Sequence, residues 1–152
     1  MKSKVKSQKS KVYKTLTLDK LKLSYHTFIL TMNNTSISIQ ERSKKFAVRV
    51  IKAYVELNEN KNFNDASVVL SKQFLRSGTS IGANCSEAKS AQSRKDFTHK
   101  YEIALKEAQE FKYWCEVMIE AGIVSEKKLG LLLQETREII NILAATVNSL
   151  KK

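Results

Sequence analysis

The chain has 152 residues, of which 42% are hydrophobic and 28% charged, and its formal net charge is +12 at neutral pH. This length is close to the commonest domain size, so a single domain needs no metal or disulfide to stabilise its core. With no proline and only four glycines, the composition favours uninterrupted helices and predicts an all-α protein. Cys85 and Cys115 lack the spacing of a metal site or redox pair, so we expect buried free thiols, no metal and a reducing, cytoplasmic setting.

The excess positive charge is concentrated at the amino end of the chain. Residues 1–34 contain eight lysines and one aspartate, whereas the rest contains nineteen basic and fourteen acidic residues. We therefore predict a basic, disordered arm over residues 1–35 and a folded domain over residues 36–152. A rival hypothesis is that translation starts at Met32. The apolar run at residues 28–30 is too short for a signal peptide or a membrane span, so no membrane partner is expected.

A first helix is predicted from Ser38 to about Asn58. Ser38 and Glu41 form a capping box, in which each side chain satisfies a backbone N–H that the helix leaves without a partner. Apolar residues then recur at helical spacing on one face: Phe46, Val50, Ala53 and Leu57, widened by Ala47, Ile51 and Tyr54. An asparagine-rich loop follows, in which Asn64 or Asp65 is expected to cap the next helix.

A second helix is predicted over residues 65–91, and its centre is rich in small and polar residues. Helical phasing places Ser77 and Asn84 on its apolar seam, where a buried asparagine lowers stability but fixes register and association state. Gly78 and Gly82 lie four residues apart on one face and predict the close approach of a neighbouring helix. The segment lacks the Gly-Lys-Ser/Thr ending of a phosphate loop, so nucleotide binding is not expected.

A third helix is predicted from a capping box at Ser93 and Asp96 to Gly122, a residue type that commonly ends helices. Its main apolar face follows a heptad pattern: Phe97, Tyr101, Ala104, Ala108, Phe111, Cys115 and Met118. This pattern predicts one continuous buried face.

Polar residues form a stripe beside the apolar face on both the second and the third helix. They are Arg76, Ser80, Asn84 and Glu87 on the second helix, and Glu107, Glu110 and Trp114 on the third. We expect the two stripes to face each other, with Arg76 paired to Glu107 or Glu110 in or beside the core. A buried pair of this kind is strongly destabilised when one partner is removed.

The fourth helix is predicted from Ser125 to about Leu150. It has a heptad row and a parallel row of apolar residues: Leu129, Leu132, Thr136, Ile139, Leu143, Thr146 and Leu150, with Leu133, Ile140 and Val147 beside them. So broad an apolar face predicts contacts beyond the helix's own bundle, and therefore self-association. Four helices joined by short loops predict an antiparallel up-and-down four-helix bundle.

Two clusters of basic residues are candidate nucleic-acid-binding sites. The first helix carries four cations along one stripe: Arg42, Lys45, Arg49 and Lys52. The third helix carries a smaller cluster near its start, formed by Arg94, Lys95 and Lys100. Asp96 and Glu102 partly neutralise it. The alternative for both clusters is a solvated helix face whose long side chains cover apolar surface.

Several short motifs occur together over roughly residues 40–150: Thr79–Asn84 with Glu87 and Ala88, Ile103–Ala108, Tyr113–Trp114 and Glu120–Gly122. Their combination resembles the four-helix-bundle family of 23S rRNA intervening-sequence proteins. More distantly, the chain resembles the accessory protein of diversity-generating retroelements. The resemblance implies a bacterial protein that forms a four-helix bundle and a ring-like homopentamer. It brings no catalytic residues, and it implies structural roles for Ser80, Gly82, Asn84 and Glu87.

We expect a non-enzymatic, oligomeric protein that binds RNA, DNA or a nucleoprotein through charge. Few aromatic residues accompany the cations, so base stacking is not indicated and sequence preference is expected to be weak. The alternative is an assembly scaffold whose partner is a protein and which has no nucleic-acid role. An enzyme is not expected, because neither His26 nor His99 has a nucleophile at a telling spacing. No cofactor and no small-molecule substrate are indicated.

Overall fold

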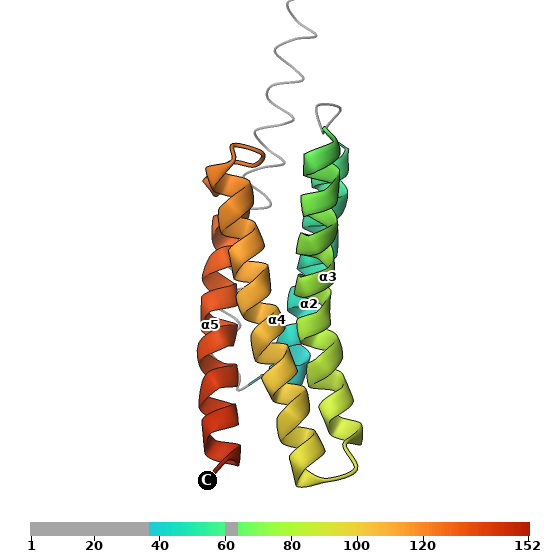
Figure 1. Ribbon diagram of the computed structural model, residues 1–152, viewed down its shortest axis with the longest axis vertical. Helices are drawn as coiled ribbons and strands as arrows, with labels where there is room; N and C mark the ends of the chain where they lie inside the picture. The colour runs from blue at the N-terminus through green and yellow to red at the C-terminus, as the bar shows by residue number, and fades with distance from the viewer. Residues whose placement is uncertain (1–36, 60–63) are drawn as a thin grey trace, which may run out of the picture. The chain divides into compact units, whose positions relative to one another are not determined.

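The computed structural model describes residues 37–59 and 64–152, which form four α-helices and no strand (Figure 1). In chain order the helices are α2 (Ile39–Asn58), α3 (Asp65–Glu87), α4 (Arg94–Glu120) and α5 (Glu126–Leu150), with a short 3-10 helix, η1 (Ala88–Ser90), after α3. The all-α prediction is confirmed for these residues. The arm predicted over residues 1–35 and the alternative start at Met32 lie outside them.

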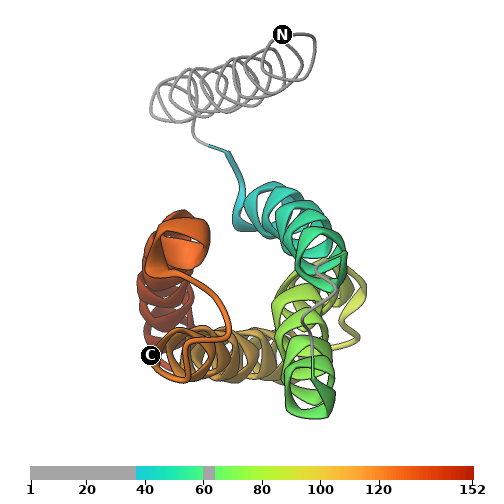
Figure 2. The ribbon, with the colours of Figure 1, turned by 90° about the horizontal axis from the view of Figure 1, so that it is seen from above.

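The four helices run alternately up and down and pack side by side in chain order. Figure 2 looks along the bundle and shows α3 beside α2, α4 beside α3, and α5 beside α4. The first and last of these helices, α2 and α5, contact each other much less extensively than any consecutive pair. We call the boundary between them the α2–α5 seam.

The helix ends follow residues that the sequence singles out. Three helices begin after a residue whose side-chain oxygen accepts a hydrogen bond from a backbone N–H three residues later: Ser38, Asn64 and Ser93. Such caps satisfy donors that the first helical turn leaves without a partner. Ser125 precedes α5 as predicted, although its side chain makes no capping hydrogen bond. Beyond α4, Gly122 has a φ of 69°, in the left-handed region that favours glycine, whereas α3 ends at Glu87, short of the predicted residue 91.

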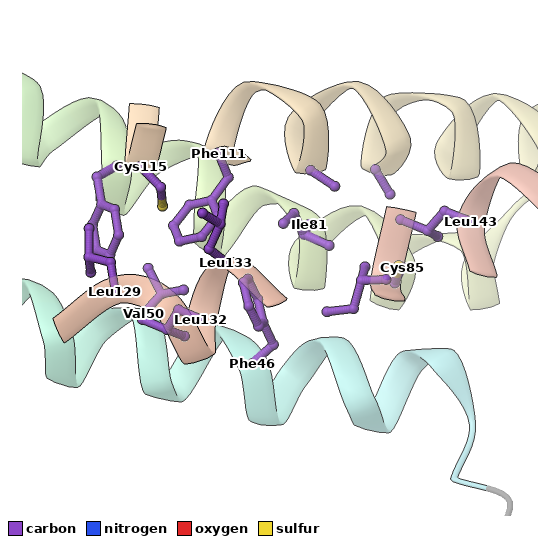
Figure 3. Close-up of a cluster of buried hydrophobic side chains, with 14 of the residues drawn as sticks. Phe46, Val50, Ile81, Cys85, Phe111, Cys115, Leu129, Leu132, Leu133 and Leu143 are labelled. Atoms are coloured by element: carbon purple, nitrogen blue, oxygen red, sulfur yellow. The ribbon is translucent and has the colours of Figure 1, made fainter. Parts of the chain in front are cut away.

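The core is centred on aromatic residues contributed by three helices. The Phe111 ring of α4 lies 5.3 Å from the Phe46 ring of α2 and 4.7 Å from the Phe74 ring of α3, measured between ring centroids. Figure 3 shows Phe46 and Phe111 together with Leu132 and Leu133, which α5 contributes to the same core. The predicted heptad face of α4 is buried from Tyr101 to Met118, which confirms that pattern.

Two glycines of α3 permit the close helix contacts that their spacing predicts. A Cβ atom on Gly78 would lie 2.7 Å from the Phe111 ring and from Val50 Cγ1. A Cβ atom on Gly82 would lie 3.0 Å from the backbone oxygen of Ser43 in α2. The bare backbone of α3 therefore lets α2 and the Phe111 ring approach more closely than any other residue would allow.

The two cysteines are buried free thiols, as predicted. Burial raises the pKa of Cys85 and of Cys115. Because the thiolate is the reactive form of cysteine, both residues act as packing groups in the folded bundle.

One prediction about an apolar residue is wrong, because Ile51, expected to widen the buried face of α2, is 46% exposed. The second apolar row of α5 packs within the bundle: Leu133 and Val147 are buried, and Ile140 packs against the core. Contacts of α5 beyond the bundle stay a prediction.

Candidate nucleic-acid interface

Two of the four cations predicted along α2 lie in the α2–α5 seam. Arg49 pairs with Glu135, and Arg42 pairs with Glu138. Arg42 Nε also lies 3.9 Å from Glu135 Oε1. The side chains of Arg49 and Glu135 are only 20% and 11% exposed. We call these four residues the seam cluster, because they join the first helix of the bundle to the last.

Burial changes the pKa of two members of the seam cluster, Arg49 and Glu135. It lowers the pKa of Arg49 to about 10. It also raises the pKa of Glu135 to about 7, although the charge of Arg42 opposes that rise. Removing water from both charges costs free energy, which their mutual attraction offsets only while both partners are present. Arg42 and Arg49 thus join α2 to α5 through these ion pairs, and their predicted contact with nucleic acid stays a prediction.

The two lysines of the same stripe stay on the surface. Lys45 Nζ lies 2.8 Å from Glu41 Oε1 in the preceding turn, and Lys52 is exposed. With both arginines turned toward α5, the remaining cations do not form a continuous basic row. The α2 stripe is thus a weaker candidate for phosphate binding than its spacing predicts.

Two residues of the second predicted cluster, Arg94 and Lys95, line a groove of about 470 Å³ between the start of α4 and the end of α5. The third, Lys100, does not line this groove and pairs with Glu87. Lys151, directly after α5, adds a third cation to the groove. We call this the basic groove, and it is lined by Arg94, Lys95, Thr98, His99, Glu102, Leu150 and Lys151. The up-and-down topology creates it, because α4 begins at the end of the bundle where α5 finishes (Figure 1).

Polar contacts join the two walls of the basic groove. Arg94 Nη2 donates to the backbone oxygen of Leu150 at 3.4 Å, a favourable place for a cation because the carboxyl end of a helix is partially negative. Lys151 Nζ lies 2.7 Å from Glu102 Oε1, and His99 Nδ1 lies 3.6 Å from Glu102 Oε2. Lys151 and then His99 lower the pKa of Glu102, so the groove sets three cations against one ionised carboxylate.

Sequence reasoning identified Arg94 and Lys95 but missed Lys151. The hydrogen bond from Arg94 to Leu150 spans 56 positions of the chain, too far for a local pattern to reveal. The predicted topology could have pointed to Lys151, since an up-and-down bundle places the end of the fourth helix beside the start of the third.

The polar stripes of α3 and α4 face each other as predicted, but at the surface. Arg76 Nη1 lies 3.8 Å from Glu110 Oε1, and these side chains are 67% and 37% exposed. Trp114 donates its indole N–H to the same Glu110 oxygen at 3.1 Å. On the same two helices, Lys100 pairs with Glu87 at 2.6 Å. The predicted partner Glu110 is confirmed, whereas the predicted position of Arg76 in or beside the core is wrong.

The remaining polar residues of this region differ in burial and in hydrogen bonding. Ser77 is buried as predicted, and its hydroxyl donates to a carbonyl of its own helix at 2.7 Å. Asn84 is only half-buried and donates to the Ser80 carbonyl at 2.9 Å, so the prediction of a buried asparagine that needs a partner helix is wrong. Glu107 Oε2 is buried with no hydrogen-bond partner among the described residues. Burial, followed by the charge of Glu110, raises the pKa of Glu107.

Comparison with known proteins identifies the family. A family model described as 23S rRNA-intervening sequence protein matches residues 35–145. The chain belongs to this family. It is also similar to a protein of unknown function from the S23 ribosomal protein family of Bacteroides thetaiotaomicron, whose crystal structure aligns with a TM-score of 0.65. The two sequences are 43% identical over 72% of this chain and 98% of that chain. No protein of curated function matches.

Neither a metal centre nor a membrane span can be assigned to the described part of this 23S rRNA-intervening sequence family member. Over residues 37–59 and 64–152, no group of three or more His, Cys, Asp or Glu side chains is arranged to hold a metal ion. None of the helices in the same ranges is long and apolar enough to cross a membrane.

The surface position of Arg76 in this family member gives a testable expectation. Replacing Arg76 with alanine is expected to lower the free energy of unfolding by less than about 1 kcal/mol, because exposed ion pairs contribute little. Urea unfolding of the variant and the parent measures this difference. A loss of about 3 kcal/mol or more, typical of a broken buried pair, would show that Arg76 is buried in solution.

Proposed function

We propose that this chain is a non-enzymatic, self-associating protein that binds the phosphate backbone of nucleic acid through the basic groove. The observation that supports this proposal is the convergence of cations from two separate helices on one concave surface. Arg94 and Lys95 come from α4, and Lys151 follows α5. Phosphate contacts made by lysine and arginine supply most of the affinity of proteins that bind nucleic acid without sequence preference.

The side chains of the basic groove favour contacts with the phosphate backbone of a nucleic acid over recognition of its bases. Its lining contains no phenylalanine, tyrosine or tryptophan, so it offers no platform on which bases could stack. Binding that depends on charge alone weakens steeply as salt displaces the protein from the phosphates. The expected ligand is therefore RNA or DNA of any sequence, free or within a nucleoprotein, held at low ionic strength.

Charge reversal of the basic groove tests this function. The variant Arg94→Glu, Lys95→Glu, Lys151→Glu is expected to bind duplex RNA or DNA at least tenfold more weakly at low salt. A plot of log affinity against log salt concentration should also have a shallower slope for this variant, by up to about 3. Each lost phosphate contact removes about 0.9 from that slope. Fluorescence anisotropy of a labelled duplex over a salt series measures both quantities.

The control separates the groove from overall charge. It reverses three surface cations elsewhere on the bundle, in the variant Lys106→Glu, Lys127→Glu, Arg137→Glu. Both variants are made in a background where the eight amino-terminal lysines are glutamines, because these would otherwise contribute binding of their own: Lys2, Lys4, Lys6, Lys9, Lys11, Lys14, Lys20 and Lys22. Equal losses in the two variants would reject the basic groove as the site. Unchanged binding in both would reject nucleic-acid binding through the bundle.

Self-association would repeat the basic groove around the assembly and raise its avidity for a phosphate polymer. The family resemblance leads us to expect five copies, about five times the chain mass of 17.3 kDa. Light scattering coupled to size-exclusion chromatography, performed on the full chain at micromolar concentration, measures this mass. The mass of a single chain would remove self-association from the proposal.

A second candidate function, a scaffold that binds a protein, rests on a different face of the bundle. The outer face of α2 exposes Val48, Ile51 and Val55. Exposed apolar residues at helical spacing are typical of surfaces that receive a partner helix. The two functions use different helices, so one chain can carry both.

A further inference from the structure

The outer face of α2 carries apolar side chains that the bundle does not bury. Val48, Ile51 and Val55 are 46%, 46% and 50% exposed. Their spacing of three and four residues places them on one stripe of the helix, opposite the buried stripe of Phe46 and Val50. We call these three residues the α2 ridge. A single exposed valine needs no explanation, but three in register form a continuous surface.

A groove adjoins the α2 ridge on the side of α3. It has a volume of about 620 Å³, and small residues from both helices line it, including Ala47, Gly82 and Ala83. A Cβ atom on Gly82 would lie 3.0 Å from the Ser43 backbone oxygen and 3.4 Å from Ala47 Cβ. The backbones of α2 and α3 are therefore close together at this groove, and the missing side chain of Gly82 permits that contact.

The charged side chains around this surface are mostly lysines. Lys44 and Lys89 line the groove from its two sides, and Lys52 is exposed one helical turn from Val48 and Val55. The one carboxylate that lines the groove, Glu41, is bound by Lys45 at 2.8 Å. Lys45, followed by Lys44 and Lys89, lowers the pKa of Glu41. Glu56 and Glu59 are exposed beside Val55 at the far end of the ridge, where Lys128 pairs with Glu56 at 3.3 Å. The surface is thus an apolar stripe whose groove end is bordered mainly by cations.

We propose that the α2 ridge and the adjoining groove bind an amphipathic helix of another protein, one whose apolar stripe is flanked by aspartate and glutamate. Apolar residues of such a helix, at positions i, i+3 and i+7, would pack on Val48, Ile51 and Val55. Its carboxylates would pair with Lys44 and Lys89 on either side, giving orientation and partner choice. This interaction does not rest on the nucleic-acid proposal, because it uses none of the residues of the basic groove.

Two other occupants fit this surface less well. A lipid surface is flat, whereas the small-residue groove between α2 and α3 is concave and would stay unfilled. A second copy related by two-fold symmetry would place its own lysines against Lys44, Lys52 and Lys89, and like charges brought together oppose association. A neighbouring copy in a ring would meet this face with a different surface of its own, so the test below counts a second copy as an outcome that overturns the proposal.

Site-specific photo-cross-linking in the native host tests the proposal on the full chain. A photoreactive amino acid replaces Ile51 in one sample and, as the matched control, Val69 in another, because Val69 is an exposed valine of α3 (58%) outside the ridge. The expected result is an adduct at position 51 that is absent at position 69. The cross-linked peptide should come from another protein and carry apolar residues at helical spacing between acidic residues.

A binding measurement on the captured peptide completes the test. The synthetic peptide is expected to lose at least tenfold in affinity for the Lys44→Glu, Lys89→Glu variant and for Ile51→Glu, but not for Val69→Glu. Circular dichroism confirms that each variant is folded. An adduct with a second copy of this chain, with lipid or with a segment lacking acidic residues would overturn the proposal. Equal labelling at positions 51 and 69, or equal affinity for all variants, would do the same.

Discussion

Replacing Arg49 with alanine is expected to lower the free energy of unfolding by about 3–5 kcal/mol, because it leaves the Glu135 carboxylate buried without its closest cation. The side chains of Arg49 and Glu135 are among the least exposed charged groups of the bundle, at 20% and 11%. Glu135→Ala should have a comparable effect by leaving Arg49 without its carboxylate. Urea unfolding monitored by circular dichroism measures both losses at pH 8, where the Glu135 carboxyl of the parent is mostly ionised.

The double variant Arg49→Met, Glu135→Leu is the control for this prediction. Exchanging a buried ion pair for apolar residues of similar volume is often neutral or stabilising, because neither charge then needs to lose its water. The double variant should therefore unfold close to the parent, far from the sum of the two single losses. Losses that simply add would show that the two residues stabilise the bundle independently.

The pH dependence of stability offers a second readout of the seam cluster. The pKa of Glu135 in the folded bundle, about 7, lies above its ordinary value of 4.5. The folded state therefore binds this proton more tightly than the unfolded chain does. The stability contributed by the protonated carboxyl is complete below about pH 4.5 and is lost as the pH rises through about 7. Glu135→Gln should remove this part of the pH dependence, which parallel unfolding curves at pH 5 and pH 8 would show.

Phe111→Ala is expected to cost about 3–5 kcal/mol of unfolding free energy, the range for removing a buried aromatic side chain from a packed core. The Phe111 ring is fully buried and contacts the rings of Phe46 and Phe74. Tyr113→Ala is the matched control on the same helix, because the Tyr113 side chain is 56% exposed. Its effect should stay below about 1 kcal/mol, and equal losses would show that Phe111 is not at the centre of the core.

The loss of stability caused by adding a side chain at position 78 should depend on the presence of the Phe111 ring. In the parent, a Cβ atom at position 78 meets the Phe111 ring at 2.7 Å, so Gly78→Ala is expected to destabilise the bundle despite the better helix propensity of alanine. In the Phe111→Ala background the ring is gone, Val50 has room to move, and the penalty of Gly78→Ala should shrink. A double-mutant cycle measures this coupling. A coupling energy of zero would mean that α3 and the ring do not compete for the same space.

Most of the helix framework could be predicted from the sequence, because its signals are local. Ser38, Asn64 and Ser93 cap helices through hydrogen bonds three residues away, a distance that a reader of the sequence can count. The buried face of α4 could be predicted equally well, since an unbroken heptad pattern of apolar residues shows which face of the helix packs against the core. The close contacts at Gly78 and Gly82 followed from their residue type and spacing.

Residues at the edges of the buried faces could not be assigned in this way. Successive residues of a helix are about 100° apart, so a position beside the buried stripe faces either a neighbouring helix or solvent according to the handedness of the bundle. Ile51 and Asn84 were assigned to the core and lie outside it. Arg42 and Arg49 were assigned to a ligand-binding surface and instead meet carboxylates of α5. Helical spacing alone cannot tell which neighbour lies on which side.

The α2–α5 seam has a consequence for how the bundle forms. The other close backbone contacts between the long helices join helices that are consecutive in the chain, whereas the pairs Arg49–Glu135 and Arg42–Glu138 connect residues 86 and 96 positions apart. Closing the seam therefore carries the largest loop-closure entropy of the fold, which favours earlier docking of α3 on α4. If the seam forms after the folding transition state, substitutions there accelerate unfolding and leave the folding rate nearly unchanged. The kinetic lifetime of the native bundle would then depend on the helix pair with the fewest contacts.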